Sequence, residues 1–350
     1  MKAVLITSSI LILLIAALRP LLRGKIPPKA QYALWLVVAL RLLIPVNLVT
    51  SAYSALALLD RADEPPQIVQ TIGQTAIPVQ SYDDARAQVV QEYVRQGVPE
   101  ANFTPADLTA IDQQAQELMR GPTVGEIAAK LAKPVWLTGA ALMAGWFLLV
   151  NANLRRKLRG AKRLNGVNCP LPVYVSDALP SPCQCGVFRP TIYVTPAALD
   201  DPNRLRHVLA HEFTHCRHRD HWWAVLRCLC LCLYWFDPLV WWAAALSRQD
   251  CELACDEGAI RRLGEEERIP YGRTLVAMIA AGRNPLLQTA TTMTGGKRRV
   301  RERVRLIARK PKTVLAVALA LAVIIACAVG CTFTGPRKVL PSLTPPPRLP

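Results

Sequence analysis

The sequence predicts a mainly α-helical membrane protein, with four transmembrane helices and a cytoplasmic α+β domain inserted between the third and the fourth. Three observations carry this prediction: four apolar blocks, the sign of the charges beside them, and a strand-then-helix pattern in the long polar part. The chain has 350 residues, is 52% hydrophobic and carries a net charge of +17. Its apolar residues gather in blocks, whereas a soluble domain spreads them along its helices and strands.

Each apolar block approaches or exceeds the roughly 17–25 residues that cross a bilayer. We place two transmembrane helices within residues 1–59, the third at 134–150 and the fourth at 313–331. The first block could also be a cleaved signal peptide. A second apolar block follows it so closely that we favour a retained helix.

The flanking charges orient these helices, because loops rich in Lys and Arg stay in the cytoplasm. Residues 60–132 carry eleven acidic and five basic side chains, so we expect the loop at 60–133 to be extracytoplasmic. Basic runs follow the third block and precede the fourth, which places residues 151–312 in the cytoplasm. Both termini are then extracytoplasmic.

The basic excess and the cysteines have structural explanations. Basic side chains could contact nucleic acid, but here they flank membrane segments and attraction to anionic membrane lipid explains them. We therefore expect no direct nucleic-acid contact. Nine of the eleven cysteines lie between Cys169 and Cys255, on the predicted cytoplasmic side, where they should be reduced. The runs Cys183–Cys185 and Cys228–Cys232 lack the paired spacing of a structural zinc site.

Within the cytoplasmic part, two short strands precede two helices. Pro172–Ser176 and Thr191–Thr195 are rich in Val, Ile, Tyr and Thr, which predicts strands. Asp200-Asp201-Pro202 and Asp237-Pro238 each join an acidic N-cap to a proline at the first helical position. Gly264 is a natural end for the second helix.

The first of these helices carries His211-Glu212-Phe213-Thr214-His215, the H-E-x-x-H pattern. This spacing places two imidazoles on one helical face with a carboxylate beside them. A hydrolytic zinc site needs three protein ligands and an open position for water, whose pKa the metal lowers to about 7. His211 and His215 are the predicted ligands and Glu212 the predicted general base. We expect His207 to be packed and His218 to be solvated.

The third ligand has two candidates. His221 follows His215 at the spacing of H-E-x-x-H-x-x-G-x-x-H enzymes, but His218 stands where those enzymes need glycine. Glu252 lies on the second helix, with Asp256 one turn further on the same face. We favour Glu252 as the ligand, with Asp256 orienting a ligating imidazole.

Two features of the apolar segments need separate explanations. Trp222–Leu246 is apolar and holds five of the eight tryptophans. One membrane crossing there would separate Glu252 from the histidines, and the segment is too short to cross twice, so we interpret it as buried or interfacial. Arg41, inside the second block, either has a structural role against neighbouring helices or snorkels toward the cytoplasm.

Together these residues resemble the membrane zinc peptidases of the BlaR/MecR antirepressor type, the transducers of bacterial beta-lactam sensing. The resemblance implies a gluzincin-like fold, zinc on His211, His215 and Glu252, Glu212 as base and Asp256 as support. The segments that carry it are Leu40–Pro45, Gly186–Tyr193, Leu209–Glu212, Trp235–Trp241 and Glu252–Glu257.

The resemblance also implies a substrate class and an arrangement for it. Thr191–Thr195 would be an edge strand for pairing an extended peptide or protein substrate. That substrate could be a cytoplasmic regulator such as a transcriptional repressor, or the chain itself within Asn284–Gly296. Only the Pro-rich residues 332–350 follow the fourth block in this sequence, so we expect no beta-lactam sensing by a C-terminal penicillin-binding domain.

Two other functions remain compatible with the same residues. The protein could be a non-proteolytic signalling or scaffold protein in which zinc only stabilises the domain. A fourth protein ligand, such as His221 or Cys216, would favour that alternative because it would close the metal site. The protein could also be a housekeeping protease for membrane proteins.

Overall fold

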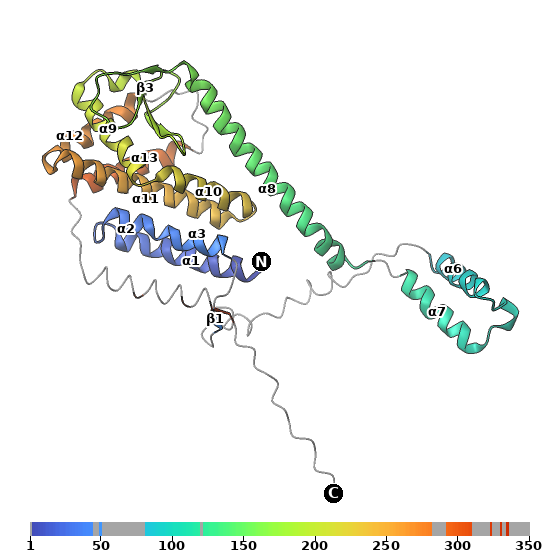
Figure 1. Cartoon of the computed structure of the whole chain (residues 1–350). Helices are drawn as coiled ribbons and strands as arrows, with labels where there is room; N and C mark the ends of the chain where they lie inside the picture. Colours follow the sequence, from blue (N-terminus) through green and yellow to red (C-terminus); the bar gives the residue numbers. More distant parts are fainter. Residues whose placement is uncertain are drawn as a thin grey trace, which may run out of the picture. The chain divides into compact units, whose positions relative to one another are not determined.

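The computed structural model is mainly α-helical with a small four-stranded sheet, as the sequence predicts (Figure 1). It describes residues 2–44, 49–50, 81–119, 122–281 and 292–309, with the isolated positions 323, 330 and 334–335. Contacts divide the chain into one unit of Met1–Arg61 with Ala140–Pro350 and a second unit of Ala62–Gly139. A short parallel pair joins β1 (Val49–Thr50) to β6 (Thr334–Gly335).

The smaller unit contains a helical hairpin within the predicted acidic loop. Helix α6 (Tyr82–Arg95) packs against α7 (Pro105–Met119), with the 3-10 turn η1 (Glu100–Asn102) between them. Their shared core is small and apolar, with Ala85, Val89, Ile111 and Ala115 each less than 5% exposed. The predicted loop therefore has a core of its own, built from residues four apart on each helix.

Two helices are long and apolar enough to cross a membrane, judged by length and composition alone among the described residues. They are Val4–Leu22, within α1 (Lys2–Leu22), and Val124–Gly160, which comprises α8 (Val124–Lys157) and η2 (Leu158–Gly160). The predicted third segment, 134–150, lies inside α8.

The other two predicted segments are only partly described. The second block contains α2 (Pro28–Ala33) and α3 (Trp35–Leu43), and residues 45–48 and 51–59 lie outside the described part of the chain. The predicted fourth segment, 313–331, lies outside it except for two isolated positions.

The sheet of the larger unit has four short strands in the order β2-β3-β5-β4. The two predicted strands are confirmed as β3 (Val173–Val175) and β5 (Thr191–Val194), which pair in parallel. β2 (Lys162–Arg163) adds antiparallel to β3, and β4 (Cys183–Cys185) adds antiparallel to β5. Strand β5 is therefore interior, and the prediction that Thr191–Thr195 forms an edge is wrong. The edge on that side is β4, because the connection between β3 and β5 folds back onto β5.

Five helices follow the sheet in the part of the chain that the structure describes, and both predicted helix starts are confirmed. The side chain of Asp201 accepts a hydrogen bond from the Asn203 amide, and that of Asp237 accepts one from the Leu239 amide. The helices are α9 (Pro202–Arg217), α10 (Asp220–Leu233), α11 (Pro238–Leu263), α12 (Arg268–Ala281) and α13 (Thr292–Ala308), with short turns η3 (Pro196–Ala198) and η4 (Glu265–Glu267) beside them.

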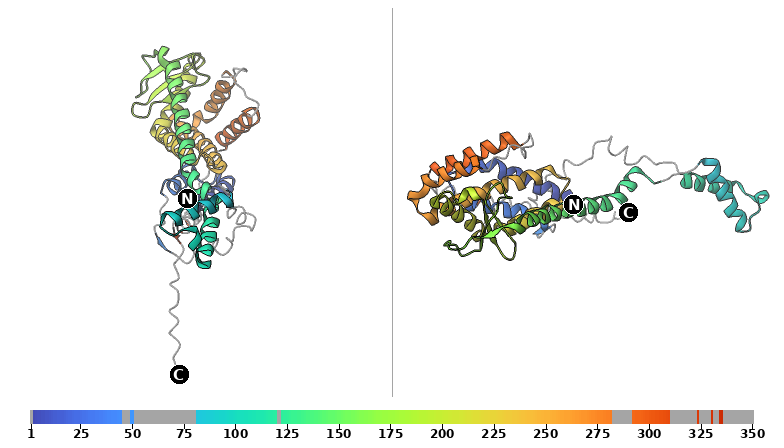
Figure 2. Two further views of the ribbon diagram at one scale, coloured as in Figure 1. Left: turned by 90° about the vertical axis from the view of Figure 1, so that its right-hand side faces the viewer. Right: turned by 90° about the horizontal axis from the view of Figure 1, so that it is seen from above.

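Helix α11 lies at the centre of the larger unit. It contacts α1 and α2 on one side and α9 and α13 on the other, while α12 and α13 lie side by side (Figure 1 and Figure 2). The tryptophan-rich segment Trp222–Leu246 is divided between α10 and the first turns of α11, with a turn at Tyr234–Asp237. This segment is therefore two helices in contact rather than one spanning helix.

A buried carboxylate holds the N-terminal helices on α11. Asp250 is 1% exposed, and its two oxygens accept hydrogen bonds from Arg19 Nε at 2.7 Å, Gln31 Nε2 at 3.1 Å and Trp35 Nε1 at 2.8 Å. These donors come from α1, α2 and α3 in turn. One side chain therefore fixes three N-terminal helices at a single point on α11.

A second buried polar contact lies between α1 and α3. Arg41 is fully buried, and its Nε donates to Thr7 Oγ1 at 2.9 Å. Of the two interpretations of Arg41, the structure favours the structural role between neighbouring helices.

Asp250→Ala should destabilise the protein strongly, because it leaves the buried guanidinium of Arg19 without its carboxylate. Removing one partner of a buried ion pair costs about 3–5 kcal/mol. The apparent melting temperature of the full chain in detergent measures this loss. Asp200→Ala is the matched control: Asp200 pairs with Arg204 but is 67% exposed, and exposed pairs contribute about 0–1 kcal/mol. Equal melting temperatures for the two variants would contradict this account of Asp250.

Candidate metal centre

The H-E-x-x-H helix and α11 bring three potential metal ligands together. His211 and His215 are one turn apart on α9, and their Nε2 atoms are 3.2 Å apart. Glu252 of α11 places its Oε2 at 3.6 Å from His211 Nε2. The three ligand atoms all lie within 4.8 Å of one another. Among the described residues, His221 and Cys216 are not members of this group.

These separations fit one tetrahedral zinc ion. Zinc–nitrogen bonds of roughly 2.0–2.1 Å and tetrahedral angles place neighbouring ligand atoms about 3.3 Å apart. The measured 3.2 and 3.6 Å straddle that value. Two nitrogens and one carboxylate oxygen are also the ligand types that catalytic zinc sites use. The residues present therefore fit the metal.

A glycine allows the two helices to approach this closely. A Cβ atom at Gly258 of α11 would lie 2.6 Å from Thr214 Cγ2 of α9, which is shorter than any ordinary contact. Thr214 lies between the two histidines in the sequence of α9 and is buried against α11. A larger residue at position 258 would push α11 away and separate Glu252 from the histidines.

A chain of hydrogen bonds fixes the orientation of His211. Tyr271 Oη donates to Asp256 Oδ1 at 2.7 Å and lies 2.8 Å from His211 Nδ1, so it can accept the proton of that nitrogen. Arg303 then donates to both oxygens of Asp256 at 2.7 Å. With Nδ1 protonated, the lone pair of His211 is on Nε2, where the metal would be.

A separate carboxylate orients His215. Asp220 Oδ2 lies 2.8 Å from His215 Nδ1. Arg219, between α9 and α10, has left-handed backbone angles of φ 60° and ψ 37°, which residues other than glycine rarely adopt. This turn reverses the chain directly after α9 and returns Asp220 to the histidine five residues earlier. Both imidazoles therefore have an acceptor at Nδ1, and their Nε2 atoms face each other.

The charges around the site oppose the effect of burial. Burial would lower the pKa of His211, but hydrogen bonds with Asp256 and Glu252 outweigh it and raise the pKa to about 9. Burial would raise the pKa of Glu252 and of Asp256. The hydrogen bond with His211 and the charge of Arg303 instead lower both values well below the usual range. The carboxylates are therefore ionised at neutral pH and ready for a cation.

Glu212 lies beside this group and faces the sheet. It is 7% exposed, and its helix α9 contacts β4 and β5. Glu212 is close enough to the edge strand β4 to affect a side chain there. A hydrogen bond with Cys185 and burial raise the pKa of Cys183, and the negative charge of Glu212 raises that pKa further. Glu212 thus lies between the two histidines in sequence and toward β4 in space.

The remaining histidines lie apart from this group. His207 is 1% exposed, with Nδ1 at 2.8 Å from Thr274 Oγ1 and Nε2 at 3.0 Å from Glu267, so it is packed as predicted. His218 is half-buried rather than solvated, with Nδ1 at 3.7 Å from Cys255 Sγ. The structure places Glu252, and not His221, with the H-E-x-x-H histidines.

The chain also matches a known protein family. The family model described as BlaR1 peptidase M56 matches residues 1–307. This chain belongs to the BlaR1 peptidase M56 family. The description of this family names a peptidase.

Individual relatives in the family are distant. The chain is 29% identical over 102 residues to the "Regulatory protein BlaR1" of Bacillus licheniformis, a match that covers 29% of this chain and 17% of the relative. It is 22% identical over 141 residues to the "Methicillin resistance mecR1 protein" of Staphylococcus aureus (strain Mu50 / ATCC 700699), covering 39% of this chain and 24% of the relative. The chain thus spans less than a quarter of either relative's length.

Three residues around this candidate centre are missing from the sequence prediction: Asp220, Tyr271 and Arg303. Asp220 is only five residues after His215, so predicting a chain reversal directly after α9 would have placed its carboxylate beside that histidine. Tyr271 and Arg303 lie on α12 and α13 and reach the site only through the packing of those helices, so no local pattern marks them.

Tyr271→Phe should weaken metal binding, because it removes the acceptor at 2.8 Å from His211 Nδ1. Loss of such a supporting contact typically costs 10–100-fold in metal affinity, and we expect about that factor here. Competition with a chelating indicator dye measures it in the purified full chain. Tyr174→Phe, in the sheet, is the matched control and should leave the affinity unchanged. An unchanged affinity in the Tyr271 variant would show that the tyrosine has no part in holding the metal.

Proposed function

We propose that this chain is a zinc metallopeptidase of the gluzincin type, embedded in the membrane, that hydrolyses peptide bonds on the cytoplasmic side. The observation that carries the proposal is the convergence of His211 Nε2, His215 Nε2 and Glu252 Oε2 from two helices, all within 4.8 Å of one another. The bound zinc would lower the pKa of a coordinated water and polarise the substrate carbonyl.

The chain's own residues supply the remaining chemistry. Glu212 would accept the proton of the attacking water and pass it to the leaving amine. Tyr271, Asp256 and Arg303 would hold His211 in the tautomer that leaves Nε2 unprotonated, and Asp220 would do the same for His215. The open fourth position supports hydrolysis over a purely structural zinc site, since no fourth protein ligand joins the group among the described residues.

Strand β4 would bind the substrate. It is the sheet edge nearest to α9, and β5 occupies only one of its sides. An extended peptide can add to such an edge through backbone hydrogen bonds. Glu212 faces this strand, so a peptide paired with β4 would pass the general base and the metal.

Cleavage would serve signalling. The relatives' names, a regulatory protein and a methicillin-resistance protein, support a regulatory role over housekeeping proteolysis. A cytoplasmic regulator, such as a transcriptional repressor, is the substrate class we propose. Self-cleavage within Asn284–Gly296 is the second possibility; residues 284–291 lie outside the described part of the chain, and 292–296 begin α13.

Glu212→Gln should abolish proteolysis and leave zinc bound, because glutamine cannot accept the proton while the three ligands stay intact. A lost general base typically costs about 10²–10⁴ in rate. Membranes containing the wild type or the variant are compared by mass spectrometry of newly formed protein N-termini, and by zinc content. Glu266→Gln, on the exposed turn η4, should cleave normally. Proteolysis that persists in the Glu212 variant would refute the mechanism.

The proposed topology places the α6–α7 hairpin outside and the sheet inside, with both termini extracytoplasmic. Epitope tags inserted after Gly97 and after Gly166, both exposed, report on the two sides. In intact cells stripped of their wall, antibody should reach the tag at Gly97. It should reach the tag at Gly166 only after permeabilisation, because basic flanks keep that region in the cytoplasm. The reverse pattern would invert the topology.

A further inference from the structure

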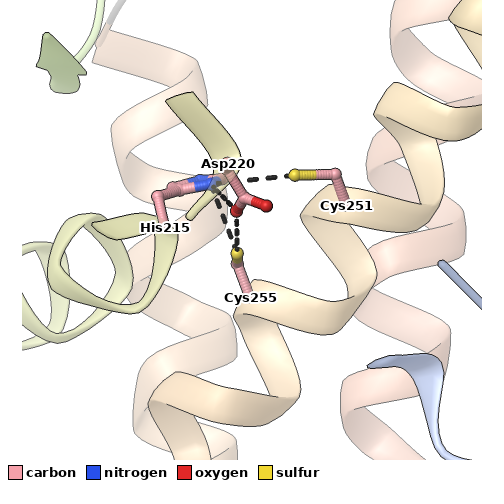
Figure 3. Close-up of side chains that lie close together, drawn as sticks. All are labelled: His215, Asp220, Cys251 and Cys255. Atoms are coloured by element: carbon pink, nitrogen blue, oxygen red, sulfur yellow. Dashed lines mark hydrogen bonds and ion pairs between the residues drawn. The ribbon is translucent and has the colours of Figure 1, made fainter. Parts of the chain in front are cut away.

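Four side chains form a second cluster on the Nδ1 side of His215, and His215 is one of the four (Figure 3). Cys251 and Cys255 project from one face of α11, and Asp220 comes from the first residue of α10. The fourth member is His215 itself, through Nδ1 rather than Nε2. The potential ligand atoms of all four residues lie within 4.8 Å of one another.

The distances within the cluster fit a metal ion. Cys255 Sγ lies 3.2 Å from His215 Nδ1 and 3.1 Å from Asp220 Oδ2, and Cys251 Sγ lies 3.8 Å from the same Nδ1. Zinc–sulfur bonds of roughly 2.3 Å and zinc–nitrogen bonds of roughly 2.0–2.1 Å place such atoms about 3.5 Å apart in a tetrahedral site. Two sulfurs, one oxygen and one nitrogen would complete that coordination without water.

An unsatisfied oxygen supports a ligand at this position. Asp220 is 6% exposed, and its Oδ1 is buried with no hydrogen-bond partner among the described residues. An ionised carboxylate oxygen in that state is costly. Cys251 and Cys255 are 3% and 0% exposed, so water does not replace the missing partner from their side. A cation held between the thiolates and Asp220 would relieve this cost.

We propose that Cys251, Cys255, Asp220 and His215 Nδ1 form a second metal site, for a thiophilic divalent cation such as zinc or cadmium, whose filling disables the first. A neutral imidazole has one protonated and one unprotonated ring nitrogen. Binding through Nδ1 moves its proton to Nε2 and releases the two thiol protons to solvent.

The protonated Nε2 of His215 then points at His211. It lies 3.2 Å from His211 Nε2, which is hydrogen-bonding distance. His215 would donate to His211, so both histidines lose the lone pairs that the first site needs. The two sites therefore exclude each other. The inhibitory consequence rests on the proposed function, whereas metal binding at the thiols does not.

Cadmium titration of the metal-free full chain in detergent, with a non-chelating reductant, tests the site. Two cysteine pairs allow a matched comparison, because Cys228 and Cys232 on α10 have the same spacing as Cys251 and Cys255 on α11. Wild type and Cys228→Ser/Cys232→Ser should show the ultraviolet thiolate-to-cadmium absorption of this site. Cys251→Ser/Cys255→Ser should lose it. The same absorption in all three proteins would show that Asp220 only orients His215 and that the thiols are packing residues.

Zinc release tests the exclusion. Protein preloaded with one equivalent of zinc should release it to an indicator dye when cadmium is added, in the wild type and in Cys228→Ser/Cys232→Ser. Cys251→Ser/Cys255→Ser should retain it. Cadmium absorption without zinc release, or equal release in all three proteins, would overturn the antagonism.

Single substitutions keep the test valid should the double variant not fold. Cys251→Ser and Cys255→Ser should each weaken cadmium binding by at least about 10-fold, the lower end of the loss seen for supporting residues. An unchanged affinity in both would overturn the site. Glu212→Gln retains all four ligands, so it should give wild-type cadmium spectra. Loss of the proposed peptidase function and loss of this site are therefore separate results.

Discussion

The contact between Asp250 and the three N-terminal helices is the constraint on which the larger unit depends. A carboxylate that is 1% exposed would be strongly unfavourable without its charged and polar donors. Arg19, Gln31 and Trp35 satisfy it from three helices, and they can do so only in one arrangement. Asp250 stands two residues before Glu252, so the interaction that positions the N-terminal helices also fixes the part of α11 that faces the histidines.

Helix α11 therefore serves two polar sites from one short stretch. Glu252 faces Nε2 of His211 and Asp256 faces its Nδ1. Cys251 and Cys255 face Asp220 and Nδ1 of His215. The close approach at Gly258 brings both faces within reach of a single imidazole. Small displacements of α11 would change both sites together, because neither has a ligand set independent of it.

Local chemistry explains which parts of this arrangement the sequence predicts. The capped helices at Asp201 and Asp237, the β3 and β5 strands and the H-E-x-x-H face depend on neighbouring residues. Glu252 was found because its helix also carries Asp256 at a matching spacing. The edge of the sheet was predicted wrongly, because strand order depends on how the chain folds back between strands. Tyr271 and Arg303 could not be predicted, since they act only through the packing of α12 and α13.

The shared core of α11 has a practical consequence for anyone dissecting the protein. Its first half contributes Val240, Ala243 and Leu246 to the same apolar cluster as residues of α1 and α3. A truncated fragment beginning after the third apolar segment would expose this apolar side of α11 to solvent, together with the carboxylate of Asp250. Such a fragment is expected to aggregate or to lose the geometry around Glu252. The part of this chain that carries the H-E-x-x-H histidines is not a detachable module, and assays on it belong in detergent or lipid with the first helices in place.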